Sequence, residues 1–403
     1  MMRPFTLVEL AARTGGRLVG EDATVTGAAI DSRTIAPGDL FAALPGSRVD
    51  GHAFLAAALD AGAAAALVSR PVEVPLPQLL VEDVALALGR IARANRELYR
   101  APLIAITGSC GKTTVKGMLA AMLGEAGPTL ATEGNLNNEL GVPLSLLRLA
   151  PEHAFAVIEL GARGEGHIAY LCELARPTVS VLLNAMEAHL EFFGSVDGVA
   201  RGKGEIFDGL PADGFAVINA DQPYRGEWTA RASHSGATVL TFGTAADADC
   251  RASAVALRGA AGSAFMLHTP AGEAPVELAV PGGHNVANAL AAAAVAHACG
   301  LVPAAIAAGL SRAGAVAGRL ARHRGFGGMT VIDDCYNASP GSVRAAIDLL
   351  AGCAGPTVIA LGAMLELGDA ADAFHAEMGR RARERGIDVF VGVGDAVRPA
   401  LEA

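Results

Sequence analysis

Short apolar runs alternate with helical patterns through the middle of the chain. Four runs have the length of buried strands: LIAIT (103–107), AFAVIEL (154–160), VSVLLN (179–184) and GFAVINA (214–220). Residues 112–124 between the first two have apolar positions at helical spacing. Continuous apolar runs are typical of parallel strands that are buried on both faces. Strands that alternate with helices therefore predict an α/β fold built on a parallel sheet with crossover helices.

The remaining segments predict three domains, at 1–100, 101–313 and 314–403. The first mixes short strands with helical patterns at 54–63 and 84–100, and the second includes turn-separated segments at 237–281 that predict a small antiparallel insert. Helices are expected from 285 to 299 and from Pro303 onward. The third domain repeats the α/β pattern, with strands at 329–334, 356–362 and 387–394 and helices at 341–352 and 371–386. Because this pattern stops at Ala403 after few strands, we expect an incomplete C-terminal domain.

Composition narrows the class of protein. The chain is 52% hydrophobic and 18% charged, and its formal charge of −10 argues against nucleic acid as the main partner. Six cysteines occur without C-x-x-C or zinc-like spacing, which favours reduced thiols and a cytoplasmic location. Glu9 interrupts any signal-peptide core, and the most apolar stretch is broken by Asp60.

A loop typical of phosphate binding follows the first of these strands. TGSCGKTT (107–114) lies between an expected strand and an expected helix, where glycines let the backbone approach an anion and Lys112 adds positive charge. The Thr113 hydroxyl is placed to bind Mg²⁺. The usual first glycine is replaced by Ile106, so the loop has a shortened form, T-G-x-x-G-K-T. A chance glycine turn before a helix is the alternative.

The shortened loop and other segments resemble the ATP-dependent Mur ligases, and among them the MurF type. The segments that carry the resemblance are AIDSRTIAPGDLFAALPGSRVDGHAF (29–54), EGNLNNELGVPLSLLRL (133–149), VIELGA (157–162), NAMEAHLEFFGS (184–195), ARGKGEIF (200–207), GGHNVANALAA (282–292) and VIDDCYNASPGS (331–342). The resemblance implies a uridine-nucleotide domain, a central ATPase domain and a C-terminal Rossmann-like domain. It also implies an enzyme that uses ATP to join D-alanyl-D-alanine to UDP-N-acetylmuramoyl-tripeptide through an acyl phosphate. We expect this enzyme to be a monomer.

The resemblance also implies a metal site. Thr113, Glu159 and His189 correspond to ligands of Mg²⁺, and Lys203 corresponds to a lysine that is carbamylated to N6-carboxylysine. The open alternative for Lys203 is an unmodified amine that contacts the acyl phosphate directly. The alternative for Glu159 is an acidic residue that ends a strand at the surface, and a lone histidine is more often structural.

Further residues are implied for the two ligands. The ATP site would comprise Thr107, Gly108, Ser109, Cys110, Gly111, Lys112, Thr113, Thr114, Asn285, Asn288, Arg319, Asp334, Tyr336 and Asn337, with His284 and Asp333 beside them. The catalytic set would be Lys112, Lys203, His189, Glu159 and Arg319, with Arg319 reaching the γ-phosphate through a hinge near 312–318. The substrate site would comprise Ser32, Arg33, the loop GSRVDGH (46–52) with Asp50, Gly51 and His52, and Asn135, Asn137 and Asn138. Asparagines also form turns and caps, so those readings stay open.

Two departures from the family pattern stand out. In LGAMLELG (361–368), Ala363 replaces the usual acid, whereas Glu366 is kept. The Lys-Gly-Ser-Arg segment expected near the end of the last domain does not occur before Ala403. A sibling ligase, of the MurE or folylpolyglutamate type, and a P-loop regulator that hydrolyses ATP remain the alternative functions.

Overall fold

The computed structural model describes residues 2–46 and 49–403, which form two compact units. The first unit comprises the residues up to Leu103 together with Thr129–Leu160 and Tyr170–Arg176, and the second comprises Ile104–Pro128, Gly161–Ala169 and Pro177–Ala403. Helix α6 (His167–Ala175) supplies residues to both. The fold is mixed α/β, as the sequence predicts.

The first unit contains the N-terminal α/β region. Its strands are β1 (Phe5–Thr6), β2 (Arg17–Val19), β3 (Thr24–Val25), β4 (Gly27–Ala29), β5 (Asp39–Ala42), β6 (Ala65–Val68), β7 (Gln78–Leu80), β9 (Thr129–Ala131) and β10 (Phe155–Glu159), and its helices are α1 (Leu7–Thr14), α2 (Leu55–Asp60), α3 (Val84–Glu97) and α5 (Gly141–Leu147). One sheet has the order β2-β7-β6-β5-β4, in which β4 to β7 are parallel; β1 pairs with β3, and β9 pairs in parallel with β10. Phe41, Leu55 and Val68 centre the core between this sheet and α2.

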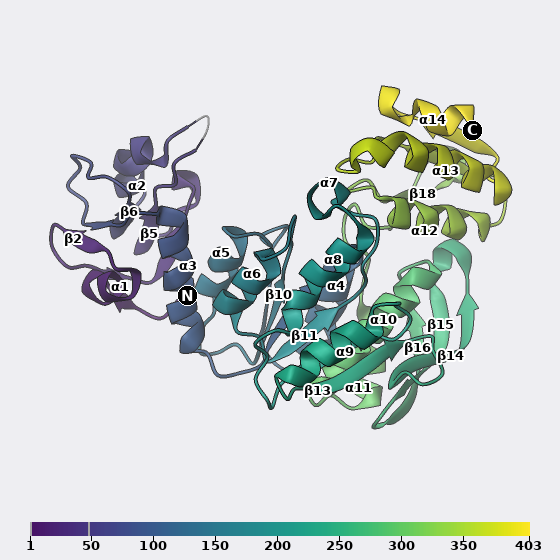
Figure 1. The fold of residues 1–403 in the computed structure, drawn as a ribbon, viewed down its shortest axis with the longest axis horizontal. Coiled ribbons are helices and arrows are strands. Elements are labelled where there is room, and N and C mark those ends of the chain that lie inside the picture. The colour runs from purple at the N-terminus through teal and green to yellow at the C-terminus, as the bar shows by residue number, and fades with distance from the viewer. Residues whose placement is uncertain (1, 47–48) are drawn as a thin grey trace. The chain divides into compact units, whose positions relative to one another are not determined.

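The second unit is organised by one large sheet. Its strands follow the order β16 (Gly272–Leu278), β15 (Ser263–Thr269), β14 (Cys250–Leu257), β13 (Thr238–Gly243), β12 (Phe215–Asn219), β11 (Val179–Leu182) and β8 (Leu103–Thr107). Helices α4 (Lys112–Ala126), α7 (Leu190–Phe193), α8 (Val196–Gly204), α9 (Arg225–His234), α10 (Gly283–Ala298) and α11 (Pro303–Arg312) accompany it (Figure 1). Helix α10 packs on β12 and β13 and against α4 and α11. Ala291 to Ala294 are fully buried, and their small side chains allow this close packing.

The register of this sheet brings the ends of three strands together. Leu182 of β11 pairs with Thr107 of β8 and with Ile218 of β12, all in parallel. The segments that follow these strands therefore leave the same edge of the sheet. In parallel sheets the carboxyl edge is where ligands bind, so this register positions the candidate site.

The antiparallel insert begins later than the sequence suggests. Strand β13 was expected within it, but β13 is parallel to β12 and belongs to the main sheet. Its threonines are polar, but Thr241 is buried. Its hydroxyl donates to Asp249 Oδ2 at 2.6 Å, which satisfies the hydroxyl inside the protein. Within the described strands of this sheet, the antiparallel pairs are β14 with β15 and β15 with β16, whereas β13 pairs in parallel with β14.

The C-terminal residues of the second unit form a smaller α/β region. It comprises β17 (Ala321–Arg324), β18 (Thr330–Asp333), α12 (Pro340–Ala351), β19 (Val358–Leu361), α13 (Ala371–Glu384), β20 (Val389–Gly392) and α14 (Arg398–Glu402). Strands β17 and β18 are antiparallel, and β19 and β20 are parallel. Ile347, Met378 and Val397 join α12, α13 and the segment before α14 in one core.

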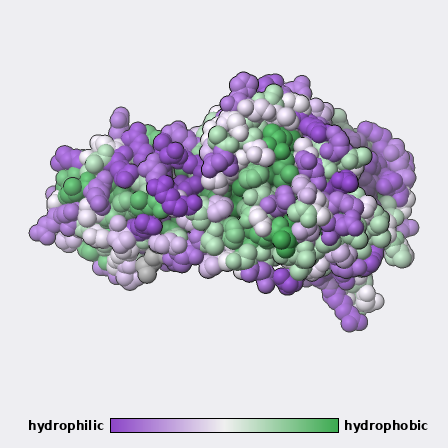
Figure 2. Space-filling model, turned by 90° about the horizontal axis from the view of Figure 1, so that it is seen from below, coloured by the Kyte–Doolittle hydropathy of each residue, from purple (hydrophilic) through white to green (hydrophobic). Residues whose placement is uncertain are grey.

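The surface is mixed in polarity. On the face shown in Figure 2, hydrophilic side chains lie among smaller hydrophobic areas. Within the part of the chain that the structure describes, no helix is both long enough and apolar enough to span a membrane.

Candidate nucleotide and metal site

The loop between β8 and α4 has the geometry of a phosphate cradle. Gly111 precedes α4 with φ 88°, a left-handed conformation that favours glycine, and a Cβ there would lie 2.4 Å from Asn288 Oδ1. The Lys112 ammonium donates to the Gly108 carbonyl oxygen at 2.6 Å. Backbone N–H groups at the start of α4 and a lysine thus share one small volume, which suits an anion.

The segment Asn184–His189, which follows β11, holds this loop in place. The Asn184 side chain accepts from Cys110 N at 2.9 Å and donates to Cys110 O at 3.2 Å. Ser109 Oγ accepts from Met186 N at 3.0 Å and donates to Met186 O at 3.2 Å. These bonds explain why Cys110 can occupy the loop: its backbone is clamped, and its thiol lies 3.4 Å from Ser339 Oγ.

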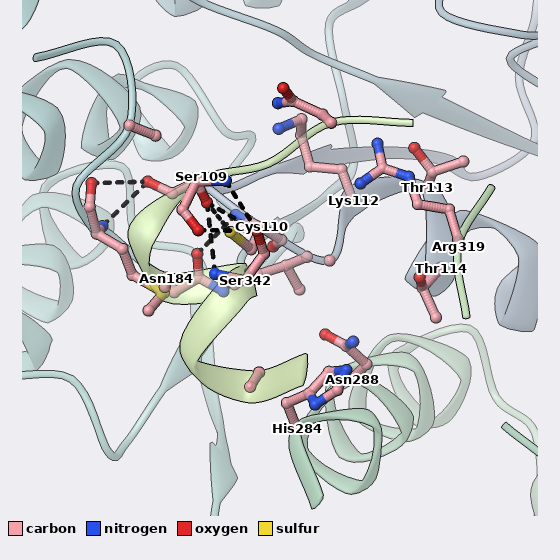
Figure 3. A pocket seen from close by; sticks show the side chains of 18 of the residues that line it. Ser109, Cys110, Lys112, Thr113, Thr114, Asn184, His284, Asn288, Arg319 and Ser342 are labelled. Carbon is pink, nitrogen blue, oxygen red and sulfur yellow. Dashed lines mark hydrogen bonds between the residues drawn. The ribbon is translucent and has the colours of Figure 1, made fainter. Parts of the chain in front are cut away.

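A cavity of about 510 Å³ opens beside the loop. It is lined by the loop residues from Ser109 to Thr114, by His284, Asn285 and Asn288 of α10, and by C-terminal residues that include Arg319, Asp334, Asn337 and Ser342. Figure 3 shows the labelled side chains from these three parts of the chain around the cavity. Segments that the sequence predicts for ATP, but that lie up to about 230 residues apart, therefore meet in one place.

The polar residues of α10 form a chain of hydrogen bonds at this wall. Asn285 Nδ2 donates to Pro281 O at 2.6 Å, and Asn288 Nδ2 donates to Asn285 Oδ1 at 2.8 Å. Gly282, and not Asn285, is the N-cap of the helix. Burial lowers the pKa of His284 to about 4, so its imidazole is neutral at pH 7 and can accept hydrogen bonds.

Arg319 brings a positive charge to the cavity from the C-terminal side. Its guanidinium carbon lies 4.2 Å from the centre of the Tyr336 ring, a cation–π arrangement that fixes the side chain. Its Nε is buried and has no hydrogen-bond partner in the described structure. Burial raises the pKa of the nearby Asp334 to about 6, although the charge of Arg319 opposes this. A buried, unsatisfied cationic nitrogen suits an anionic ligand.

Lys203 is among the most deeply buried charged side chains. It lies on α8, is 1% exposed, and its Nζ is 5.8 Å from the centre of the Phe193 ring. Burial, reinforced by the positive charge of Lys112, lowers the pKa of Lys203 to about 7. A large fraction of this amine is therefore neutral at pH 7.

His189 contacts a residue to which the sequence assigns no role. Its Nδ1 hydrogen-bonds Glu366 Oε2, and the Glu191 amide donates to the Glu366 carbonyl oxygen at 3.4 Å. Burial lowers the pKa of His189, while the bond to Glu366 raises it and Lys203 lowers it. His189 and Glu366 both have left-handed backbones, with φ 55° and 59°. Strained residues held in contact are typical of functional sites.

Glu159 ends β10 in the first unit and is 2% exposed. Asn137 Nδ2 donates to Glu159 Oε1 at 2.8 Å. Asn138 instead forms a local turn, since its Oδ1 accepts from Gly141 N at 2.9 Å. Asn135 accepts from Asn137 N through its backbone carbonyl. Of the three predicted asparagines, only Asn137 contacts the buried carboxylate.

The residues predicted to bind the uridine nucleotide also lie in the first unit. Arg33 is exposed and pairs with Asp31 at 2.6 Å, which lowers the pKa of Asp31 to about 2, and Ser32 shares the same short turn. Asp50 accepts from His52 and from Arg70, at 2.6 and 2.5 Å.

His52 is buried, and its Nε2 accepts from Ser69 N at 3.0 Å. A Cβ at Gly51 would lie 2.8 Å from the Leu44 backbone, so glycine is required there. Both ring nitrogens of His52 are thus engaged in holding this loop. Ser47 and Arg48, which the predicted loop includes, lie outside the described residues.

The structure places most predicted nucleotide residues together, with a few exceptions. Tyr336 does not line the cavity but stacks on Arg319. Asn184, Ser339 and Glu366 have no predicted role, although Asn184 ends an expected strand and Glu366 lies in a segment that resembles the family. Among the described residues, no group of three His, Cys, Asp or Glu side chains is placed to hold a metal ion.

Family models match three consecutive parts of the chain. They are described as "Mur ligase family, catalytic domain" (residues 24–102), "Mur ligase middle domain" (106–296) and "Mur ligase, glutamate ligase domain" (318–403). A relative from Escherichia coli (strain K12), named UDP-N-acetylmuramoyl-tripeptide–D-alanyl-D-alanine ligase, is 45% identical over 98% of this chain and 86% of its own length. This chain belongs to the Mur ligase family.

Other Mur ligases are also similar to this chain over most of its length. A relative of the same name from Haemophilus influenzae is 37% identical over 100% of the chain and 88% of its own length. A crystal structure of MurF from Acinetobacter baumannii matches with a TM-score of 0.94 and 38% identity, covering 100% of this chain and 88% of that one. MurF ligase from Thermotoga maritima, solved in complex with ADP, matches with a TM-score of 0.83 and 29% identity, covering 93% and 86%.

Proposed function

We propose that this protein uses ATP to join D-alanyl-D-alanine to UDP-N-acetylmuramoyl-tripeptide, in the synthesis of peptidoglycan precursors in the cytoplasm. The observation that carries the proposal is the match, over nearly the whole chain, to an Escherichia coli ligase of that name. The cavity supports it independently, because the phosphate cradle, with Lys112, and Arg319 both line it. The Thermotoga maritima structure with ADP supports nucleotide binding at this fold.

The reaction has two steps. A carboxylate oxygen of the tripeptide attacks the γ-phosphorus of ATP, and ADP leaves with the electrons of the broken P–O bond. The dipeptide amine then attacks the acyl carbon, and phosphate leaves. Such steps need positioning and charge neutralisation more than covalent help from the protein. Lys112 and the loop amides would hold the β- and γ-phosphates, and Arg319 would balance negative charge on the transferred group.

We propose that Mg²⁺ is the cofactor and that Thr113, Glu159 and His189 are its ligands. The hydroxyl of Thr113 and the carboxylate of Glu159 are oxygen donors of the kind that Mg²⁺ prefers, and the bond from Glu366 to His189 Nδ1 leaves Nε2 of His189 as a donor. When bound, Mg²⁺ would neutralise phosphate charge. A charged Lys203 beside such a cation would repel it, whereas its neutral form can add to CO₂ and lose a proton, giving a carbamate. We infer that Lys203 is carbamylated, which would turn a cation into a further oxygen donor for Mg²⁺.

We further propose that the chain divides functionally at 1–100, 101–313 and 314–403. The first part would bind the uridine nucleotide through Ser32, Arg33 and the segment Asp50–His52. Asn135, Asn137 and Asn138 would lie near the reacting carboxylate, with Asn137 the strongest candidate because it already holds Glu159.

Phosphate release tests this proposal directly. ATP, Mg²⁺ and UDP-N-acetylmuramoyl-tripeptide should give sustained release of phosphate only when D-alanyl-D-alanine is added. Release that ignores the dipeptide would indicate a regulator that hydrolyses ATP. Release with a single amino acid in place of the dipeptide would indicate a sibling ligase.

A further inference from the structure

The Asn184–His189 segment contacts the phosphate loop on one side and the C-terminal region on the other. Asn184 and Met186 bind the loop through Cys110 and Ser109, as described above. Glu187, the residue after Met186, accepts from Arg344 of α12. The phosphate loop and α12 are therefore both bonded to this one segment of six residues.

Arg344 binds two carboxylates at once in this contact. Its Nε and Nη2 donate to the two carboxylate oxygens of Glu377 on α13, at 2.6 and 2.9 Å. This two-point bond fixes the guanidinium plane and leaves Nη1, which lies 3.1 Å from both oxygens of Glu187. The side chains of Arg344 and Glu187 are only 24% and 25% exposed. Both carboxylates raise the pKa of Arg344 above its ordinary value.

The backbone beneath the ion pair is adapted to close approach. A Cβ at Gly341, in the first turn of α12, would lie 2.3 Å from the Met186 side chain. Ser342 and Ala345, which flank Arg344 in the same helix, line the nucleotide cavity. The position of α12 against the Asn184–His189 segment thus sets one wall of that cavity.

We propose that Arg344 is a positioning residue: held by Glu377, it pairs with Glu187 and thereby fixes α12 over the nucleotide cavity. Arg344 itself does not line the cavity, so it acts through α12 and the phosphate loop. The inference rests on the proposed function in one respect, that a nucleotide occupies this cavity.

ADP affinity, measured by calorimetry with the full chain, tests the inference. Arg344→Gln and Glu187→Gln should each weaken ADP binding about five-fold, the usual scale of a partly buried ion pair. The double variant should be no weaker than Arg344→Gln, because the Arg344–Glu187 bond is already lost in that single variant. Arg344→Lys should bind ADP more tightly than Arg344→Gln but less tightly than the unmodified chain. Lysine keeps the positive charge but cannot donate two parallel hydrogen bonds to Glu377.

Arg381→Gln is the matched control. Arg381 also joins α13 to α12, through Asp348 at 2.6 Å, but it does not reach the Asn184–His189 segment. It should leave ADP affinity within two-fold of the unmodified chain. An equal loss in Arg381→Gln, or an unchanged affinity in Arg344→Gln, would overturn the inference.

Amide exchange separates failure of the inference from failure of the proposed function. In the absence of nucleotide, amides of residues 184–191 should exchange about five-fold faster in Arg344→Gln but not in Arg381→Gln. These include Met186 N and Glu191 N, which are bonded to Ser109 and Glu366. If the unmodified chain binds no ADP, the proposed function is wrong, and amide exchange alone then tests the role of Arg344. Unchanged exchange in Arg344→Gln overturns the inference.

Discussion

Lys203→Met should stabilise the protein while abolishing its activity. The lysine is fully buried, and methionine has nearly the same length, so the change keeps the packing against Phe193 and removes a charge that the interior disfavours. Either role considered for Lys203, a carbamate or a direct contact with the acyl phosphate, is lost. A residue retained at a cost in stability is expected where function requires it.

The magnitude follows from the pKa. Its fall from 10.5 to about 7 means that the unfolded chain binds more protons than the folded chain between these values. The cost is fully present below pH 7 and disappears as pH rises through 10.5. Each pKa unit corresponds to about 1.4 kcal/mol, so the cost is about 4 kcal/mol at pH 7 and about 2 kcal/mol at pH 9. Lys203→Met should gain these amounts, as upper values.

Trp228 provides the assay. It is the only tryptophan in the chain, is fully buried, and donates to the Ala200 carbonyl oxygen of α8 at 3.1 Å, so its fluorescence reports on the helix that carries Lys203. Urea unfolding would be followed at pH 7 and pH 9 in buffers freed of CO₂. Arg201→Met, an exposed change on the same helix, is the control and should give no gain that depends on pH. A destabilised Lys203→Met, or a gain that does not shrink at pH 9, would refute the reasoning.

Three further changes test the site. Lys203→Ala should abolish ligation, and a small carboxylate such as propionate should restore part of it; near-full activity without propionate would contradict both roles of Lys203. Gly111→Ala, whose Cβ would meet Asn288, should weaken ADP binding at least about ten-fold, whereas Gly124→Ala, with open space around it, should not; equal affinities would contradict the proposed cradle. Glu366→Gln should raise the Mg²⁺ concentration needed for half-maximal rate about ten-fold, because the partner of a ligating histidine tunes its affinity; an unchanged requirement would leave Glu366 outside the metal site.

The sequence predicted the elements around the phosphate loop well, because local signals determine them. The apolar run 103–107, the glycines and Lys112 together specify a strand, a loop and a helix, and the structure has all three. Many of the residues predicted for ATP line one cavity, because they lie in segments with a recognisable order. Strand β13 was assigned to the wrong kind of pairing, since a buried threonine satisfied by Asp249 cannot be distinguished from an exposed one in sequence.

Contacts between residues far apart along the chain could not be predicted from the sequence. Glu366 and His189 are 177 residues apart, and Arg344 and Glu187 are 157 apart. Nothing local indicates such pairs, because charged residues on helices usually face solvent. The burial of Lys203 was likewise hidden, since α8 carries arginine and glycine on either side of it. The altered pKa depends on tertiary packing alone.

Product analysis by mass spectrometry tests the central claim most directly. Incubation of the chain with ATP, Mg²⁺, UDP-N-acetylmuramoyl-tripeptide and D-alanyl-D-alanine should convert the tripeptide nucleotide to the pentapeptide nucleotide, with one ADP and one phosphate for each new amide bond. ADP and phosphate that form without the pentapeptide product, or a product extended by a single amino acid, would contradict it.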